Sequence, residues 1–211
     1  VAGKIVARFD GGSEFGPRAL GNRSILASPL VAEMKNTLNL RIKQRESFRP
    51  FAPACLREDV ERFFELDRDA PFMLLITKAL ENSRRIIPAV VHADGTARVQ
   101  TVDDKELSGF YEVIESFKRK TDVPVVVNTS FNVNGEAIVN SPRDALESFL
   151  FMDIDYLAIG EFWVSKDQGS NSIDKLGHLE YLELRRQRYD QAYRHKLKHL
   201  DVRKYGSWFY D

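Results

Sequence analysis

The feature that most constrains how this chain folds is residues 123–138, where an apolar run ends in a group of small polar side chains. Residues 123–127 are rich in valine and bounded by turn formers, which is typical of a strand buried on both faces. Asn128, Ser130 and Asn132 follow directly. Open α/β sheets bind ligands at the carboxyl ends of such strands. The pattern therefore favours an α/β sheet with a binding loop at this point, and a polar turn without a ligand is the alternative.

The rest of the body alternates between strand-like and helix-like segments. Ser141 and Pro142 supply the cap and the first position of a helix that carries apolar residues to the core. Alternation with some hairpin character predicts an α/β fold, with a twisted sheet of mixed parallel and antiparallel strands and flanking helices. Strands are expected at residues 3–9, 24–27, 52–56, 71–77, 96–102, 155–160 and 162–164, and helices at 30–42, 57–66 and 106–120.

Charge and composition limit the classes of function. The 211 residues carry no net charge, yet residues 175–204 hold nine Lys and Arg against four Asp and Glu, which leaves the body mildly acidic. A body of that sign does not favour nucleic-acid binding. No stretch approaches the roughly 20 apolar residues of a membrane helix, and the lone Cys55 suits a reducing cytoplasm. Because the His and Cys residues show no metal-ligand spacing, we expect no protein metal site.

Five basic residues are candidates for an anion site. One lies in a glycine-rich loop at residues 10–24, whose spacing matches neither the Walker pattern nor the dinucleotide fingerprint. Three fall within seven residues of an extended, proline-bounded segment, and the fifth lies on the expected strand 96–102. Grouped cations are costly unless they share an anion, although surface ion pairs and a solvated edge are alternative interpretations. These residues are Arg18, Lys43, Arg45, Arg49 and Arg98.

Together, the cations and the polar residues Asn128, Ser130 and Asn132 are the groups that a triphosphate or acyl phosphate site needs. No serine or cysteine lies beside a histidine in a pattern typical of an activated nucleophile. Any catalysis would then depend on positioning and on charge stabilisation at phosphorus.

Several motifs resemble a known family. Lys43-Gln44-Arg45, followed far downstream by Ser130-Phe131-Asn132, resembles the K-x-R…S-x-N signature of YrdC-like domains. The longer segments 14–29, 43–53 and 125–139 are similar to the C-terminal domain of O-carbamoyltransferases, which include the nodulation-factor, cephalosporin and tobramycin enzymes. The resemblance covers about residues 3–166. We therefore expect a YrdC-like domain at residues 1–166, and a linker with a basic amphipathic helix at 167–211.

The resemblance implies a specific reaction. The domain would bind carbamoyl phosphate and ATP, with Mg²⁺ as part of that substrate, and form carbamoyl adenylate. A preceding actin/sugar-kinase-like domain with an iron site would then transfer the carbamoyl group to a hydroxyl acceptor. Because the chain opens on Val1 without that domain, we expect it to be a piece of a longer protein.

The resemblance also assigns roles to individual residues. Three of them would be catalytic: Lys43, Arg45 and Arg18. The carbamoyl phosphate site would comprise Arg18, Lys43, Arg49, Arg98 and Asn128, and the nucleotide site Lys43, Arg45, Ser130 and Asn132.

Two alternatives remain at this point, an RNA-binding module and a nucleotide-sensing module without catalysis. The basic tail bears on the RNA-binding alternative. Residues 167–172 have the composition of a linker, and 176–200 predict one amphipathic helix. That helix is compatible with docking on the body, on the preceding domain or on a second copy in a homodimer. Trp208, Phe209 and Tyr210 could form a small docking plug.

Overall fold

The computed structural model describes residues 2–166 and 177–199. The linker and the aromatic plug that the sequence predicts lie outside these residues. The strands are β1 (Val6–Phe9), β2 (Arg23–Ala27), β3 (Ala52–Leu56), β4 (Ile76–Lys78), β5 (Thr96–Arg98), β6 (Gln100–Val102), β7 (Val125–Ser130), β8 (Tyr156–Ile159) and β9 (Phe162–Ser165). The helices are α1 (Glu33–Thr37), α2 (Glu81–Ile86), α3 (Asp104–Thr121), α4 (Pro142–Phe151) and α5 (His178–His199), with a π turn at Leu38–Ile42 and 3₁₀ turns at Arg57–Arg62 and Pro88–Val90.

Seven strands form one mixed sheet in the order β6-β3-β7-β2-β1-β8-β9. The pairs β1–β8 and β3–β6 are parallel, and the other pairs are antiparallel. This confirms the mixed α/β sheet that the sequence predicts. The run of valines lies at its centre, because β7 pairs with β2 on one side and β3 on the other. Asn128 of β7 consequently lies opposite both Leu26 and Ala52.

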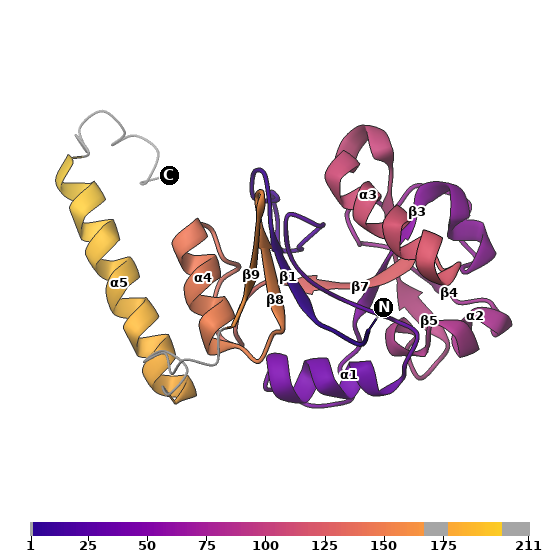
Figure 1. The fold of residues 1–211 in the computed structure, drawn as a ribbon, viewed down its shortest axis with the longest axis horizontal. Coiled ribbons are helices and arrows are strands. Elements are labelled where there is room, and N and C mark those ends of the chain that lie inside the picture. Colours follow the sequence, from indigo (N-terminus) through magenta and orange to yellow (C-terminus); the bar gives the residue numbers. More distant parts are fainter. Residues whose placement is uncertain (1, 167–176, 200–211) are drawn as a thin grey trace, which may run out of the picture.

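Alternation along the strands divides the core between the two faces of the sheet. Val125 and Val127 point into the larger cluster, which the π turn after α1 and helix α4 cover. Val126 points to the other face, where it meets Phe110 and Ile114 of α3. The three valines are at most 4% exposed, as expected for a strand buried on both faces. In Figure 1, α1 and α3 accordingly lie on opposite sides of the sheet.

Helix α4 begins where the sequence predicts. The Ser141 hydroxyl accepts a hydrogen bond from the backbone N–H of Asp144 (3.2 Å), and the Asp144 carboxylate accepts one from the Ser141 N–H (2.8 Å). This reciprocal capping box, with Pro142 at the first helical position, satisfies donors that a helix start leaves open.

Helix α5 lies against the outer side of α4, away from the sheet (Figure 1). Tyr181 is fully buried there, its ring stacked on Phe151 with centroids 4.1 Å apart. Of the docking alternatives for the tail, the structure therefore has α5 packed on the body. Among the described residues, no helix has the length and apolar character needed to cross a membrane.

The expectation of a buried strand at residues 71–77 is wrong. Met73 has a left-handed φ of 55°, which breaks the extended conformation. Phe72 and Leu74 are largely exposed, and only the short β4 forms, in a separate two-stranded sheet with β5. An apolar run alone does not distinguish a strand from an irregular segment with one buried anchor.

Two further elements differ from expectation. The single strand expected at 96–102 divides at Val99, because β5 pairs with β4 whereas β6 pairs with β3 of the main sheet. The segment expected to be a helix at 57–66 is a 3₁₀ turn that ends at Arg62. In β7, the strand continues through Ser130, so that Asn128 belongs to the sheet and not to the loop after it.

Candidate anion-binding site

A cavity of about 120 Å³ lies at the carboxyl end of β7. Arg18, Arg45 and Arg98 contribute to its wall, together with Asn128 and Ser130. An adjoining cavity of about 330 Å³ shares the three arginines and adds Arg49. No Asp or Glu is among the described residues that line either cavity. The two cavities together form a positively charged hollow, which we call the arginine hollow.

Two side-chain atoms of residues that line the arginine hollow have no hydrogen-bond partner in the part of the chain that the structure describes. The Nε atom of Arg98 and the Oδ1 atom of Asn128 are both buried and make no hydrogen bond. Burial lowers the pKa of the Arg98 guanidinium, and the charge of Arg18 lowers it further. An unsatisfied buried polar group costs roughly 1–3 kcal/mol, so such groups call for an explanation in terms of function or strain.

The amide of Asn128 has a fixed orientation. Its Nδ2 donates to the backbone oxygen of Ala19 (3.1 Å) and to Oε1 of Gln100 (2.7 Å). Gln100 in turn donates from Nε2 to the oxygen of Leu20 (2.8 Å). These bonds fasten the glycine-rich loop beside Arg18 to the sheet, and they leave the acceptor oxygen of Asn128 without a hydrogen-bond partner among the described residues. Sequence reasoning missed Gln100, which lies between Val99 and Thr101 in a segment expected to be a strand.

Glu14 organises the same loop from inside. One of its carboxylate oxygens accepts hydrogen bonds from the backbone N–H groups of Leu20 (2.7 Å), Asn22 (2.8 Å) and Arg23 (3.1 Å). The Arg23 guanidinium lies over the Phe9 ring and donates to the carbonyl oxygens of residues 10, 11 and 22. Arg23 is therefore occupied within the loop, which leaves Arg18 as the exposed arginine of this segment. Sequence reasoning predicts neither the role of Glu14 nor that of Arg23.

Arg45 follows the π turn at residues 38–42. Its Nε donates to the side-chain oxygen of Asn39 (2.7 Å), and its guanidinium lies 4.9 Å from the centroid of the Phe51 ring. Asn39 is itself fixed, because its Nδ2 donates to the backbone oxygens of Ser47 (3.1 Å) and Arg49 (2.8 Å). This support holds Arg45 at the wall of the arginine hollow. Arg49 is more exposed and forms an ion pair with Glu46 (2.9 Å).

Lys43 lies beneath the Ser130–Asn132 turn and is not among the residues that line the arginine hollow. It is 4% exposed, and its Nζ donates to the backbone oxygen of Ser130 (2.6 Å) and to Oδ1 of Asn132 (2.9 Å). Ser130 Oγ also donates to that Oδ1 (2.5 Å). The two sequence motifs thus meet, as the resemblance implied, but Lys43 holds the turn together in this structure. Its predicted contact with phosphate stays a prediction.

Lys43 makes stability depend on pH. Burial lowers its pKa from 10.5 to about 7, Arg45 adds repulsion and Glu136 opposes the shift. Between these pH values the unfolded chain holds the proton that the folded chain has lost, so a rising pH disfavours unfolding. We expect the free energy of unfolding, relative to Lys43→Met, to increase above pH 7 with a slope approaching about 1.4 kcal/mol per pH unit. Urea titrations at pH 6, 7, 8 and 9 measure it. If the difference in free energy of unfolding between the wild-type chain and Lys43→Met stays constant with pH, the lowered pKa of Lys43 is contradicted.

The structure therefore brings most of the predicted site residues together. Four arginines, Asn128 and Ser130 line one hollow, whereas Lys43 and Asn132 lie behind its Ser130 wall. Within the described ranges, no group of three or more His, Cys, Asp or Glu side chains could hold a metal ion. Fold and site define an α/β domain with a mixed sheet and a positively charged hollow at the carboxyl end of its central strand.

The family model described as carbamoyltransferase C-terminus matches residues 1–166, and the chain belongs to that family. Nodulation protein NolO of Bradyrhizobium diazoefficiens is 48% identical over 171 residues, which are 80% of this chain and 31% of NolO. The 3'-hydroxymethylcephem-O-carbamoyltransferase of Amycolatopsis lactamdurans is 40% identical over 169 residues, 80% of this chain and 32% of that enzyme. The chain thus spans about a third of the length of these curated relatives.

Proposed function

We propose that this chain is the adenylate-forming part of an O-carbamoyltransferase. It would bind carbamoyl phosphate and MgATP, form carbamoyl adenylate, and pass the carbamoyl group to a hydroxyl acceptor held by a preceding actin/sugar-kinase-like domain. Any iron would belong to that domain. The family and the relative named as a cephem carbamoyltransferase support this assignment.

The observation that carries the proposal is the pairing of unused groups in the arginine hollow. The free Nε–H of Arg98 would donate to a phosphate oxygen, together with the guanidinium of Arg18. The free acceptor Oδ1 of Asn128 would receive an N–H of the carbamoyl group. Acetyl phosphate carries a methyl group there and would leave this acceptor unpaired. The hollow would thus supply a partner for each end of carbamoyl phosphate.

The chemistry balances with one water molecule. Water displaces phosphate from carbamoyl phosphate, giving carbamate, inorganic phosphate and a proton. A carbamate oxygen then attacks the α-phosphorus of ATP, forming the mixed anhydride while pyrophosphate leaves. Arg45 lines the arginine hollow and follows Lys43 by two residues in the sequence. It would stabilise negative charge that develops at phosphorus, whereas Ser130 and Asn132 would contact the nucleotide.

Isothermal titration calorimetry tests the binding step. We expect carbamoyl phosphate to bind more tightly than acetyl phosphate, because only its N–H satisfies Asn128. Arg18→Ala should weaken carbamoyl phosphate binding by about 1.5–3 kcal/mol, the value of a hydrogen bond to a charged group. No heat above background with the wild-type chain, or undiminished binding by the variant, would refute the proposal.

Pyrophosphate release with MgATP and carbamoyl phosphate separates the catalytic proposal from the nucleotide-sensing alternative, which predicts binding without release. The RNA-binding alternative predicts retention on RNA at low salt with a steep salt dependence. Two arginines of the basic tail, Arg185 and Arg188, form ion pairs with carboxylates of the body. Their charge is therefore largely neutralised, which favours the carbamoyl phosphate proposal over RNA binding.

A further inference from the structure

Helix α5 follows the residues that the family model matches, yet it joins the body through buried groups. The Tyr181 hydroxyl lies 2.9 Å from Ser148 Oγ of α4, and the Leu182 side chain packs on the main core. Gly135, in the loop after Asn132, lies close enough that a Cβ atom there would be 3.5 Å from Leu182. The first turns of α5 therefore contact both α4 and the loop that follows β7.

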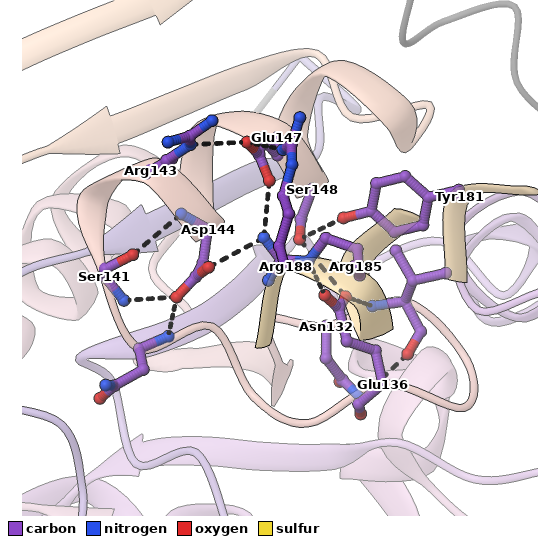
Figure 2. A network of polar contacts seen from close by, with 12 residues as sticks. Asn132, Glu136, Ser141, Arg143, Asp144, Glu147, Ser148, Tyr181, Arg185 and Arg188 are labelled. Carbon is purple, nitrogen blue, oxygen red and sulfur yellow. Dashed lines mark hydrogen bonds and ion pairs between the residues drawn. The ribbon is translucent and has the colours of Figure 1, made fainter. Parts of the chain in front are cut away.

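Arg185 of α5 lies among three carboxylates (Figure 2). Its Nε donates to Glu136 (2.6 Å), and its Nη1 donates to Asp144 and to Glu147 (2.8 Å each). The Arg185 side chain is 4% exposed and that of Glu136 is 3% exposed. A charge at such depth is stable only with its partners present, because removing one partner leaves the others unpaired away from water. Arg185 thus links α5 and α4 to Glu136.

Glu136 in turn supports the turn that holds Lys43. Its backbone oxygen accepts a hydrogen bond from Nδ2 of Asn132 (2.8 Å), and its carboxylate accepts one from the Val133 N–H (3.3 Å). Asn132 presents Oδ1 to Lys43 Nζ and to Ser130 Oγ. An unbroken series of contacts therefore runs from Arg185 on α5 to Ser130 at the wall of the arginine hollow.

We propose that Arg185 is a positioning residue. It holds Glu136 so that the Ser130–Asn132 turn keeps Lys43 buried and presents Ser130 to the arginine hollow. Through this residue, a helix outside the family-matched region sets the geometry of the predicted nucleotide side of the site. The consequence for nucleotide binding depends on the proposed function, whereas the consequence for Lys43 does not.

Amine labelling of Lys43 tests the structural step. Brief acetylation with acetic anhydride, quantified by mass spectrometry, measures how well Lys43 is protected relative to an exposed lysine such as Lys105. In Arg185→Met we expect labelling of Lys43 to increase at least fivefold. The buried Cys55 in β3 reports general unfolding, and its alkylation should not change. An unchanged Lys43, or a matching rise at Cys55, would overturn the proposal, because the second result would mean that Arg185 only stabilises the fold.

Arg188→Met is the matched control. Arg188 is on the same helix and forms an ion pair with Glu147, whereas the ion pair with Glu136 comes from Arg185. Its removal should leave Lys43 protected to within twofold. Adding Glu136→Gln to Arg185→Met removes the carboxylate left unpaired and should restore at least half of the protection. If Arg185→Met does not fold, Arg185→Lys replaces it, since one ammonium cannot reproduce the forked contacts with three carboxylates. The labelling of Lys43 relative to Lys105 in Arg185→Lys then accepts or rejects the proposal.

The kinetic readout is a split between the two substrates. Arg185→Met should raise the KM for MgATP at least fivefold, while the Kd for carbamoyl phosphate changes by less, because Ser130 is the residue of the turn that lines the hollow beside Arg18 and Arg98. Equal losses for both substrates would contradict a role confined to the turn. If the wild-type chain shows no nucleotide chemistry, the proposed function fails, and the labelling result still accepts or rejects the positioning role.

Discussion

Arg98→Met should weaken carbamoyl phosphate binding by about 2–3 kcal/mol, or about 30- to 150-fold, which would be the largest loss among the arginines of the hollow. Arg98 is half-buried, its Nε has no protein partner, and its pKa is lowered by burial and by Arg18. Its charge therefore costs free energy in the folded protein, and a bound anion would compensate that cost. Methionine keeps most of the side-chain volume and removes the donors and the charge. Calorimetric titration measures the change.

The same substitution should not destabilise the fold. Removing a partly desolvated charge that faces another arginine should leave the melting temperature unchanged or raise it, although binding is lost. Arg85→Met is the matched control, since Arg85 is exposed on α2 and lines neither cavity. Its effect on binding should be within a factor of two. A fall in melting temperature together with unchanged affinity for Arg98→Met would show that Arg98 supports the fold and not the ligand.

Gly21→Ala should destabilise the protein by about 3–5 kcal/mol, combining an unfavourable backbone conformation with overpacking. Gly21 has φ of 127°, which residues with a side chain rarely adopt, and a Cβ atom there would lie 2.5 Å from Cγ of Phe110. Phe110 is a buried residue of α3 and belongs to the cluster on its face of the sheet. Neither the backbone nor the ring can move without disturbing the loop that carries Arg18. Urea denaturation gives the magnitude.

Gly12→Ala in the same loop provides the comparison. Among the described residues other than its chain neighbours, none has an atom within 4 Å of the Cβ position at Gly12, and its φ is not in the left-handed range. The free energy of unfolding should change by less than about 0.5 kcal/mol. Equal effects at the two glycines would mean that the loop tolerates side chains generally, and that the contact with Phe110 does not fix its path.

The central strand and the capped helix α4 could be predicted because each depends on local chemistry. A valine run between turn formers specifies a buried strand, and Ser141 followed by Pro142 and Asp144 specifies a helix start. The segments at 71–77 and 96–102 could not be predicted in the same way. There, the partner strand decides the structure, because β5 and β6 are adjacent in sequence but pair in different sheets. Hydrophobic periodicity gives no information on pairing.

The candidate site also has features that could be predicted from the sequence and features that could not. The residue types that surround the arginine hollow could be named from the sequence, since cations and small polar residues are what an anion site requires. The extent to which each basic side chain is buried could not be predicted in this way. Lys43 and Arg45 are two residues apart, yet one is enclosed beneath the Ser130–Asn132 turn and the other lines the hollow. The π turn produces this difference, because Lys43 N donates to the oxygen of Leu38, five residues back, and so changes the direction of the next side chains.

The two ends of the Asn128 amide have different roles. Its nitrogen secures the loop through Ala19 and Gln100, and its oxygen, which has no hydrogen-bond partner among the described residues, would receive the proposed ligand. A change of substrate preference at this position would therefore also release the loop, unless residue 100 changed with it. Positions 100 and 128 should accordingly vary as a pair across related chains that accept different acyl phosphates.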